Sequence, residues 1–321
     1  MRLRVMSRPQ NYWRNLTLFT CIVVMITTAF LVPWLGYTRA LLLVHPVRLV
    51  PMNTPADVGI STWEEVTFLS TDGLLLSAWF IPPKSQANGA TLIFVHGLGT
   101  HREHLLDEAA MLVAHGYGAL LLDLRNHGKS AGALTTLGYA EVEDVRGAVA
   151  YLQSRAEVNP HCIALMGHSM GGATVIRAAA RIPQVRAVIA ASAFTRIEDN
   201  IAEGVRGLTG LPPFPFAPLI IWFGERETGM SINQMRPIDD VPLISPRAIL
   251  FIHGQQDDLI SASNSVRLFN AAREPKRLYL IPNAGHVGLL AANPREFERQ
   301  VMEFLEMALA RCNLTFHPNR V

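Results

Sequence analysis

The stretch Gly167-His168-Ser169-Met170-Gly171 decides how this chain folds. It follows an apolar run at 162–166 that is typical of a buried strand, and it precedes an alanine-rich run at 173–180 that is typical of a helix. A strand, a tight turn with a serine between two glycines, and a helix form the context of a nucleophile elbow. The glycines remove side chains that would collide with the strand and the helix. We therefore predict that Ser169 is a nucleophile exposed above a sheet.

A serine hydroxyl needs a base to take its proton and a carboxylate to orient that base. On this type of sheet the chain order is serine, then acid, then histidine. Residues 247–253 predict a buried strand that runs into Asp257 and Asp258. Open α/β sheets place their chemistry just past the C-terminal ends of strands. We predict Asp257 as the acid and keep Asp258 as the alternative, since either aspartate could instead cap a helix.

The predicted base is His286, which lies in a turn after an expected strand at 277–281. Downstream of the elbow the other histidines are His253 and His317. His253 precedes the acid in the chain, and His317 lies in a polar tail. The alternative for His286 is a histidine on a surface loop.

Backbone amides are predicted to stabilise a tetrahedral intermediate. The usual donors are the amide after the nucleophile and one in the loop after an earlier strand. Met170 supplies the first amide, and we predict Leu98 for the second, in the turn 96–99 after an apolar strand at 91–95. The glycines of this turn let the backbone approach a substrate closely. The alternative is a glycine-rich connection without a catalytic duty.

Five motifs together resemble the α/β-hydrolase superfamily over residues 60–311, and within it the Bem46-like and serine-aminopeptidase-like (S33-type) hydrolases. They are His96-Gly97-Leu98-Gly99, Asp123-Leu124-Arg125-Asn126-His127-Gly128-Lys129-Ser130, Gly167-His168-Ser169-Met170-Gly171, His253-Gly254-Gln255-Gln256-Asp257 and Gly285-His286. The second motif is structural in the family and usually has glycine where this chain has Asn126. Asparagine tolerates left-handed backbone better than most residues. The resemblance implies the fold and a Ser-Asp-His triad, and it leaves the substrate open.

The composition fits one large α/β domain with additional segments in 321 residues. The three cysteines, Cys21, Cys162 and Cys312, are an odd and scattered set, which argues against a disulfide framework and against a metal site. A net charge of +2 is too small to suggest a nucleic-acid partner. The sequence has no phosphate-binding loop and no dinucleotide fingerprint, so we expect no cofactor. Nothing in it indicates an oligomeric state.

Residues 15–38 contain no charged side chain and are mostly apolar. About 20 such residues suffice to cross a bilayer as a helix. Trp13, Trp34 and Tyr37 lie near the ends of this segment, as in an aromatic belt. We predict an uncleaved transmembrane helix at 15–38. A cleavable signal peptide, whose apolar region is usually about 7–15 residues, is the main alternative, and a buried core helix is another.

The flanking charges predict the orientation of this helix. The basic segment 1–14 carries four arginines, whereas Arg39 and Arg48 follow the helix. The positive-inside bias then keeps the N-terminus in the cytoplasm and places the following domain on the extracytoplasmic side of a single-pass protein. Residues 39–60 are the predicted juxtamembrane linker, whose apolar part at 40–50 either follows the membrane surface or packs against the domain.

A mostly parallel eight-stranded sheet flanked by helices is predicted for the domain at 61–311, with a tail at 312–321. Strands alternate with helical stretches, as in doubly wound α/β folds. The first two strands are separated by Thr71-Asp72-Gly73 and indicate an antiparallel hairpin at one edge. The expected strands are 63–69, 74–81, 91–96, 118–123, 162–167, 187–192, 248–253 and 277–281.

A long insertion at 194–245 is the place for a lid over the site. We predict that Phe214 and Trp222 shape an acyl or aromatic pocket there. The alternative is that the apolar lid residues only pack on the core.

Taken together, the sequence predicts a membrane-anchored serine hydrolase that cleaves carboxylic ester bonds of a small acyl substrate through an acyl-enzyme. The alternatives are a serine peptidase or an acyltransferase with the same triad, or a catalytically idle interaction module on the same fold.

Overall fold

An eight-stranded sheet runs through the body of the molecule in the order β1-β2-β4-β3-β5-β6-β7-β8. The computed structural model describes residues 10–84, 89–310 and 312. Strands β1 and β2 form an antiparallel hairpin at one edge, β2 pairs antiparallel with β4, and the remaining neighbours are parallel. The predicted mostly parallel sheet is thus confirmed. The strands are Glu64–Leu69 (β1), Leu75–Ile81 (β2), Thr91–Val95 (β3), Gly118–Leu122 (β4), Ile163–His168 (β5), Val185–Ala191 (β6), Ala248–Gly254 (β7) and Lys276–Ile281 (β8).

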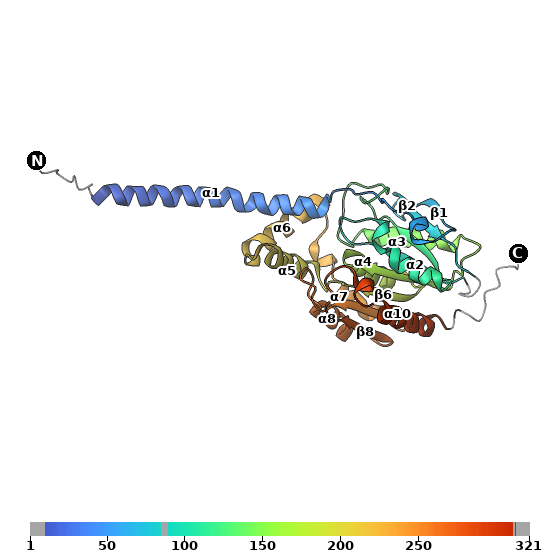
Figure 1. Ribbon diagram of the computed structural model, residues 1–321. Coiled ribbons are helices and arrows are strands. Elements are labelled where there is room, and N and C mark those ends of the chain that lie inside the picture. The colour runs from blue at the N-terminus through green and yellow to red at the C-terminus, as the bar shows by residue number, and fades with distance from the viewer. Residues whose placement is uncertain (1–9, 85–88, 311, 313–321) are drawn as a thin grey trace, which may run out of the picture.

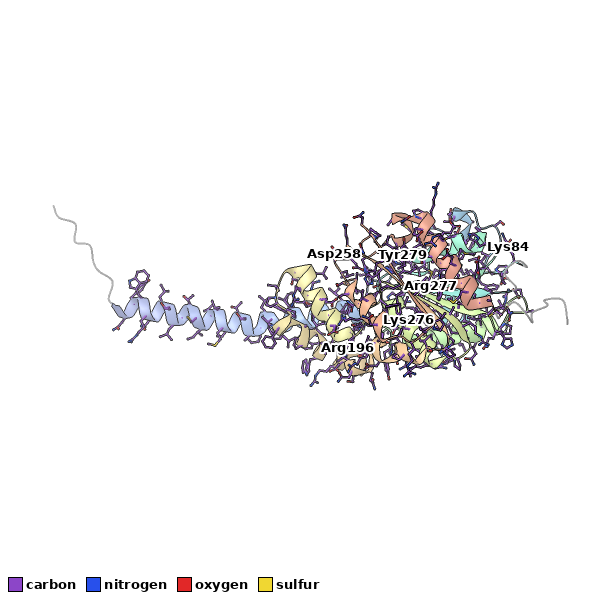
Figure 2. All side chains as sticks on the ribbon, turned by 90° about the horizontal axis from the view of Figure 1, so that it is seen from below. Lys84, Arg196, Asp258, Lys276, Arg277 and Tyr279 are labelled. Atoms are coloured by element: carbon purple, nitrogen blue, oxygen red, sulfur yellow. The ribbon has the colours of Figure 1, made fainter. Side chains whose placement is uncertain are left out.

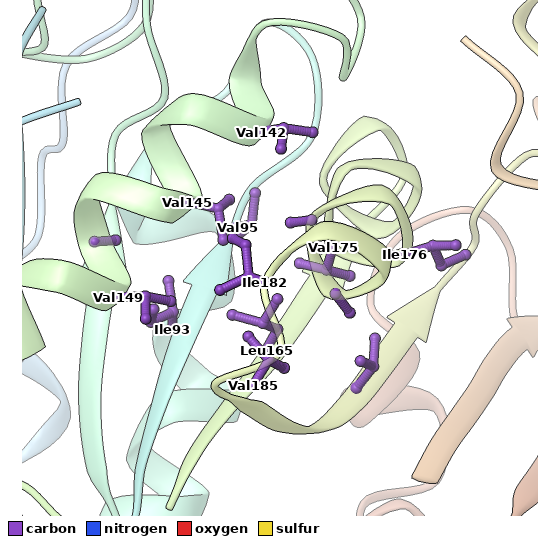
Figure 3. Packing of buried hydrophobic residues seen from close by; sticks show 14 of the residues in the cluster. Ile93, Val95, Val142, Val145, Val149, Leu165, Val175, Ile176, Ile182 and Val185 are labelled. Carbon is purple, nitrogen blue, oxygen red and sulfur yellow. The ribbon is translucent and has the colours of Figure 1, made fainter. Parts of the chain in front are cut away.

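Helices cover both faces of the sheet because the central strands are apolar on both sides. Alternate residues of a strand point to opposite faces, so Ile93 packs into the core on one face and Leu92 into the core on the other. Figure 3 shows the first core, where Val149 of α3 lies near Ile93 and Val145 lies near Val95. The covering helices are Leu106–Ala114 (α2) and Pro294–Leu309 (α10) on one face, and Glu141–Gln153 (α3), Met170–Arg181 (α4) and Ser263–Ala271 (α8) on the other.

The segment between β6 and β7 is mostly helical. Its two longer helices, α5 and α6, pack against each other beside the C-terminal ends of the strands. The segment contains Ile197–Thr209 (α5), Pro213–Thr228 (α6) and Pro237–Asp240 (α7), with short 3-10 turns at Ile232–Gln234 (η4) and Val241–Leu243 (η5). Other short elements are Pro55–Val58 (η1), Arg102–Leu105 (η3) and Leu289–Ala292 (α9). We refer to residues 194–245 as the lid.

Helix α1, Gln10–Val44, is 35 residues long and projects away from the body over most of its length (Figure 1). Among the described residues it is the one helix long and apolar enough to cross a membrane; its most apolar window has a mean hydropathy of 2.2 and no buried residue. The helix continues past the predicted end at residue 38, so the predicted linker at 39–60 is wrong at its start. The reason is packing: Ala40 is 2% exposed in a hydrophobic cluster with lid residues such as Ile201 and Ile220, and Val44 is 3% exposed.

The C-terminal half of α1 packs closely on α6. At Gly36, an added Cβ would lie 2.7 Å from the Leu219 Cβ, so a small residue is required at this crossing. The end of α1 is held by Asn126, whose Nδ2 donates to the Val44 carbonyl at 3.2 Å. Asn126 has a φ of 61°, the left-handed backbone expected at this position. The last turns of α1 are therefore part of the domain.

Candidate active site

Ser169 sits at the sharp turn between β5 and α4 with φ 57° and ψ −121°. Such backbone is strained for a residue other than glycine and persists only where its surroundings enforce it. An added Cβ at Gly167 would lie 2.2 Å from the Gly171 oxygen, and one at Gly171 would lie 2.0 Å from the Val95 oxygen. The Ser169 amide donates to the Ala191 carbonyl at 2.9 Å. Any larger residue at position 167 or 171 would collide with neighbouring backbone, so the two glycines permit this tight turn.

The structure brings Ser169, His286 and Asp257 together from the ends of three strands. His286 Nε2 lies 3.0 Å from the Ser169 Oγ, and His286 Nδ1 lies 2.7 Å from the Asp257 Oδ2. An ionised carboxylate only accepts hydrogen bonds, so the proton of the imidazole is on Nδ1. Nε2 is then free to accept the proton of the serine hydroxyl. The arrangement can perform general-base catalysis of attack by Ser169.

Asp257 is buried and receives hydrogen bonds on both oxygens. The amides of Leu259 and Ile260 donate to Oδ1 at 3.0 and 2.8 Å, and His253 Nε2 lies 3.1 Å from Oδ2. Burial by itself would raise the pKa of Asp257, but the hydrogen bonds from His253, His286 and Ile260 outweigh it and hold that pKa well below its usual range. Asp257 is therefore ionised at neutral pH, as a carboxylate that orients an imidazolium must be.

His253 is a second imidazole partner of Asp257 that the sequence reasoning did not assign to the site. Its Nε2 also lies 2.9 Å from the Ile260 carbonyl, and its Nδ1 lies 2.7 Å from the Ser265 Oγ. The signal was present, because a histidine at the end of a buried strand and four residues before the acid faces the same loop. Asp258, the alternative acid, is exposed at the surface (Figure 2).

The turn after β3 lies against the nucleophile. An added Cβ at Gly97 would lie 3.2 Å from the Ser169 Cβ. Leu98, the next residue, and Met170 both line the cavity that contains Ser169. Met170 is the first residue of α4, so its amide has no acceptor within the helix. His96 orients the turn: its Nδ1 donates to the Gly97 carbonyl at 2.7 Å, and burial lowers its pKa well below the ordinary value.

Two further histidines, His168 and His104, extend the hydrogen-bond network from His286, and the sequence did not predict their part in it. His168 Nε2 donates to the His286 carbonyl at 2.6 Å, so its Nδ1 accepts from His104 Nε2 at 3.1 Å. Burial, together with the neighbouring imidazoles, lowers the pKa of His168 to about 3 and that of His104 to about 4. Both rings are neutral at neutral pH and hold the loop that carries His286. The sequence signal for His168 is its place inside the elbow motif.

A cavity of about 640 Å³ opens beside Ser169 and His286. Its size is within the range of small-molecule sites, roughly 300–1,000 Å³. Its wall opposite Ser169 is built by the lid and, unexpectedly, by α1. Lid residues in the wall include Ile201, Val205, Leu208, Phe216 and Ile220, and those of α1 are Leu35, Gly36, Arg39, Leu42 and Leu43.

Phe214 and Trp222, the predicted pocket residues, do not line this cavity. Their side chains are 76% and 46% exposed on the outer side of the lid. Ile220 and Phe216 are the residues of α6 that line the cavity. Trp222 lies two residues after Ile220 and faces a different direction on the helix, whereas Phe214 has extended backbone (φ −84°, ψ 132°) before the regular helix begins. The amphipathic pattern of this segment is weak because nearly every residue in it is apolar, so the sequence did not separate its two faces. In the described ranges no cluster of three or more His, Cys, Asp or Glu side chains could hold a metal ion.

The sheet order and the serine turn between β5 and α4 define the α/β-hydrolase fold, which solved structures of similar proteins share. The model of the family described as serine aminopeptidase, S33 matches residues 86–222. The resemblance predicted from the motifs is therefore confirmed.

Individual proteins resemble the chain over most of its length. The uncharacterized protein YqkD of Bacillus subtilis (strain 168) is 28% identical over 239 residues, which cover 74% of this chain and 77% of that protein. The polyketide transferase ATR5 of Stachybotrys chlorohalonatus is 26% identical over 299 residues, which cover 78% of this chain and 99% of that protein. The esterase Pf2001 of Pyrococcus furiosus superposes with a TM-score of 0.69 at 26% identity, covering 83% of this chain and 98% of that structure. The family model and the likeness to the esterase support a hydrolase.

Proposed function

We propose that this protein is a membrane-anchored serine hydrolase that cleaves carboxylic esters through an acyl-enzyme on Ser169. The observation that carries the proposal is the unbroken series of hydrogen bonds from the Ser169 hydroxyl through His286 to Asp257, at 3.0 and 2.7 Å. The similarity to an esterase fold supports the same reaction class.

In the proposed mechanism, His286 Nε2 takes the hydroxyl proton while the Ser169 Oγ attacks the ester carbonyl. The ionised Asp257 stabilises the resulting imidazolium. The amides of Leu98 and Met170 hold the oxyanion of the tetrahedral intermediate. The carbon–oxygen bond to the alcohol then breaks, and His286 gives its proton to the leaving alkoxide. Water repeats the sequence on the acyl-enzyme and releases the acid.

The anchor is proposed to be the exposed part of α1, with the N-terminus in the cytoplasm and the hydrolase domain outside. The exposed apolar side chains of α1 support insertion into a bilayer. Leu42 and Leu43 belong to the cavity wall, and Ala40 is buried against the lid. Cleavage within α1 near these residues would open the cavity, so this packing supports a retained helix over a cleaved signal peptide.

The test of the triad is substitution of each member in the full chain, in detergent micelles. We expect Ser169→Ala to lower kcat/KM for an activated acetyl ester by about 10⁴-fold or more and to abolish labelling by a fluorophosphonate. Asp257→Asn should lower kcat by about 10⁴-fold because the imidazole loses its correct tautomer. Asp258→Asn is the matched control and should react like the unmodified protein. Full labelling of Ser169→Ala would refute the assignment of the nucleophile.

An acyltransferase is the second candidate, and the similarity to a polyketide transferase over 99% of that protein's length favours it. Both activities share the acyl-enzyme and differ in the nucleophile that resolves it. The partition between water and an added primary alcohol decides between them. A hydrolase releases mainly free acid at millimolar alcohol, whereas a transferase forms mainly the new ester.

A further inference from the structure

The largely apolar wall of the cavity, as far as the described residues form it, carries one arginine and no acidic side chain. Among the lining residues in the part of the chain that the structure describes, Arg39 is the only lysine or arginine, and no aspartate or glutamate is present. The low pKa values of His104 and His168 keep both imidazoles neutral at neutral pH. The wall of the cavity therefore carries one permanent positive charge, on the exposed side chain of Arg39, and no acid among the described residues of the wall balances it.

Arg39 has no partner within the described ranges of the chain: its guanidinium makes no hydrogen bond and no ion pair there. Other arginines close to α1 behave differently. Arg48, for example, donates to the carbonyls of Ser130 and Gly132 at 2.7 and 2.8 Å. A guanidinium stays charged and offers five donors in a planar fork suited to a phosphate or a carboxylate. Arg39 is thus available to an anionic ligand.

Arg39 is the first charged residue after the uncharged segment 15–38. It lies in the part of α1 that packs on the lid, because Leu35 and Gly36, which precede it, also line the cavity. Trp34 and Tyr37, which precede it, are exposed, as aromatic residues at a membrane surface are. On the other side of Arg39, Leu42 and Leu43 line the apolar interior of the cavity. If the exposed part of α1 spans the bilayer, the mouth of the cavity lies at the level of the lipid headgroups. The apolar cavity then faces acyl chains, and Arg39 faces charged head groups.

We propose that the substrates are long-chain acyl esters with an anionic headgroup, taken from the membrane. The acyl chain occupies the apolar cavity, the ester lies at Ser169, and the headgroup binds Arg39. This inference rests on the function proposed above for the choice of the ester. Attack by the Ser169 Oγ forms the acyl-enzyme, the alcohol that carries the anionic group leaves with the proton of His286, and water then releases the fatty acid.

The test measures binding in the absence of turnover. The full chain with Ser169→Ala is held in neutral detergent micelles, where no charged lipid surface exists. Binding of 1-palmitoylglycerol 3-phosphate is compared with binding of 1-palmitoylglycerol, which has the same chain and no charge. We expect the phosphate to tighten binding by about tenfold or more, the range of a charge-assisted hydrogen bond. Adding Arg39→Gln should remove this preference, and Arg39→Lys should restore part of it.

The matched control is Arg206→Gln, which removes an exposed arginine of the lid that does not line the cavity. It should leave the preference for the phosphate unchanged. Glycerol 3-phosphate, which has no chain, should not compete; competition at equal concentration would show a site for free phosphate and would overturn the lipid source. Equal binding of the two lipids, or a preference that survives Arg39→Gln, would overturn the inference. Fluorophosphonate labelling of the unmodified protein tests the proposed function separately, because it does not depend on Arg39.

Discussion

The two sides of the cavity are built on different physical principles. On the sheet side, the side chains at the strand ends form a network of hydrogen bonds, and Ser169, His286 and Asp257 each have at least one partner of fixed geometry. On the side of α1 and the lid, apolar side chains such as Leu43 and Phe216 face the cavity. Directional bonds fix the reacting groups, whereas non-directional apolar contacts shape the space for a substrate. The first side should therefore control reaction, and the second should control selection.

The largest expected effect lies on the hydrogen-bonded side and concerns pH. The pKa of His168 is lowered to about 3 and that of His104 to about 4, whereas unfolded histidine titrates near 6.5. Below that pH the unfolded chain binds more protons than the folded chain. The contribution of these two histidines to the free energy of unfolding should therefore be complete above pH 6.5 and should decrease as the pH falls toward 4. Each histidine contributes a slope of about 1.4 kcal/mol per pH unit.

Denaturant unfolding of the domain in micelles, followed by near-UV circular dichroism at several pH values, measures this slope. His104→Gln should make it smaller while keeping a donor for His168. His161→Gln, which changes an exposed histidine far from the cavity, is the control and should leave the slope as it is. A slope unaffected by His104→Gln would show that this network does not couple to folding.

The next effect lies on the apolar side and compares two phenylalanines of α6. Phe216 lines the cavity and Phe214 is exposed outside it. We expect Phe216→Ala to lower kcat/KM for a long-chain ester by about tenfold, since a partly buried aromatic ring contributes on the order of 1.5 kcal/mol of apolar contact. Phe214→Ala should change it less than twofold. The measurement is kcat/KM for palmitoyl and acetyl esters of one alcohol; equal losses in both variants would make the two faces of α6 equivalent.

The smallest effect concerns the packing between α1 and α6. Replacing glycine by alanine inside a helix normally stabilises it by about 1 kcal/mol. Gly224→Ala should follow this rule because nothing lies within 4 Å of an added Cβ there. Gly36→Ala should not, because its Cβ would meet the Leu219 Cβ at 2.7 Å. Thermal midpoints of the two variants should differ by a few degrees; a stabilised Gly36→Ala would mean that α1 is not packed on the lid as described.

The same contrast explains how much of the structure could be predicted from the sequence. The eight strands followed from apolar runs between turns, which are local signals. The assignment of Ser169, Asp257 and His286 to one site followed from turn motifs and their order along the chain. The residues of α1 and the lid that form the cavity wall could not be predicted from local signals. Phe214 and Phe216 are equally apolar, and only tertiary packing decides which of them faces inward. Nothing local in residues 39–44 shows that they contact a segment near residue 220.

The crossing of α1 and α6 has a practical consequence for anyone who wishes to handle this enzyme without lipid. Cutting the chain after Val44 would remove an obvious obstacle to solubility and keep every group of the hydrogen-bonded network. It would also remove Leu42, Leu43 and Arg39 from the cavity wall and leave the inner face of α6 bare. Such a fragment could still hydrolyse small activated esters, yet a substrate screen performed on it would report the preferences of a different pocket.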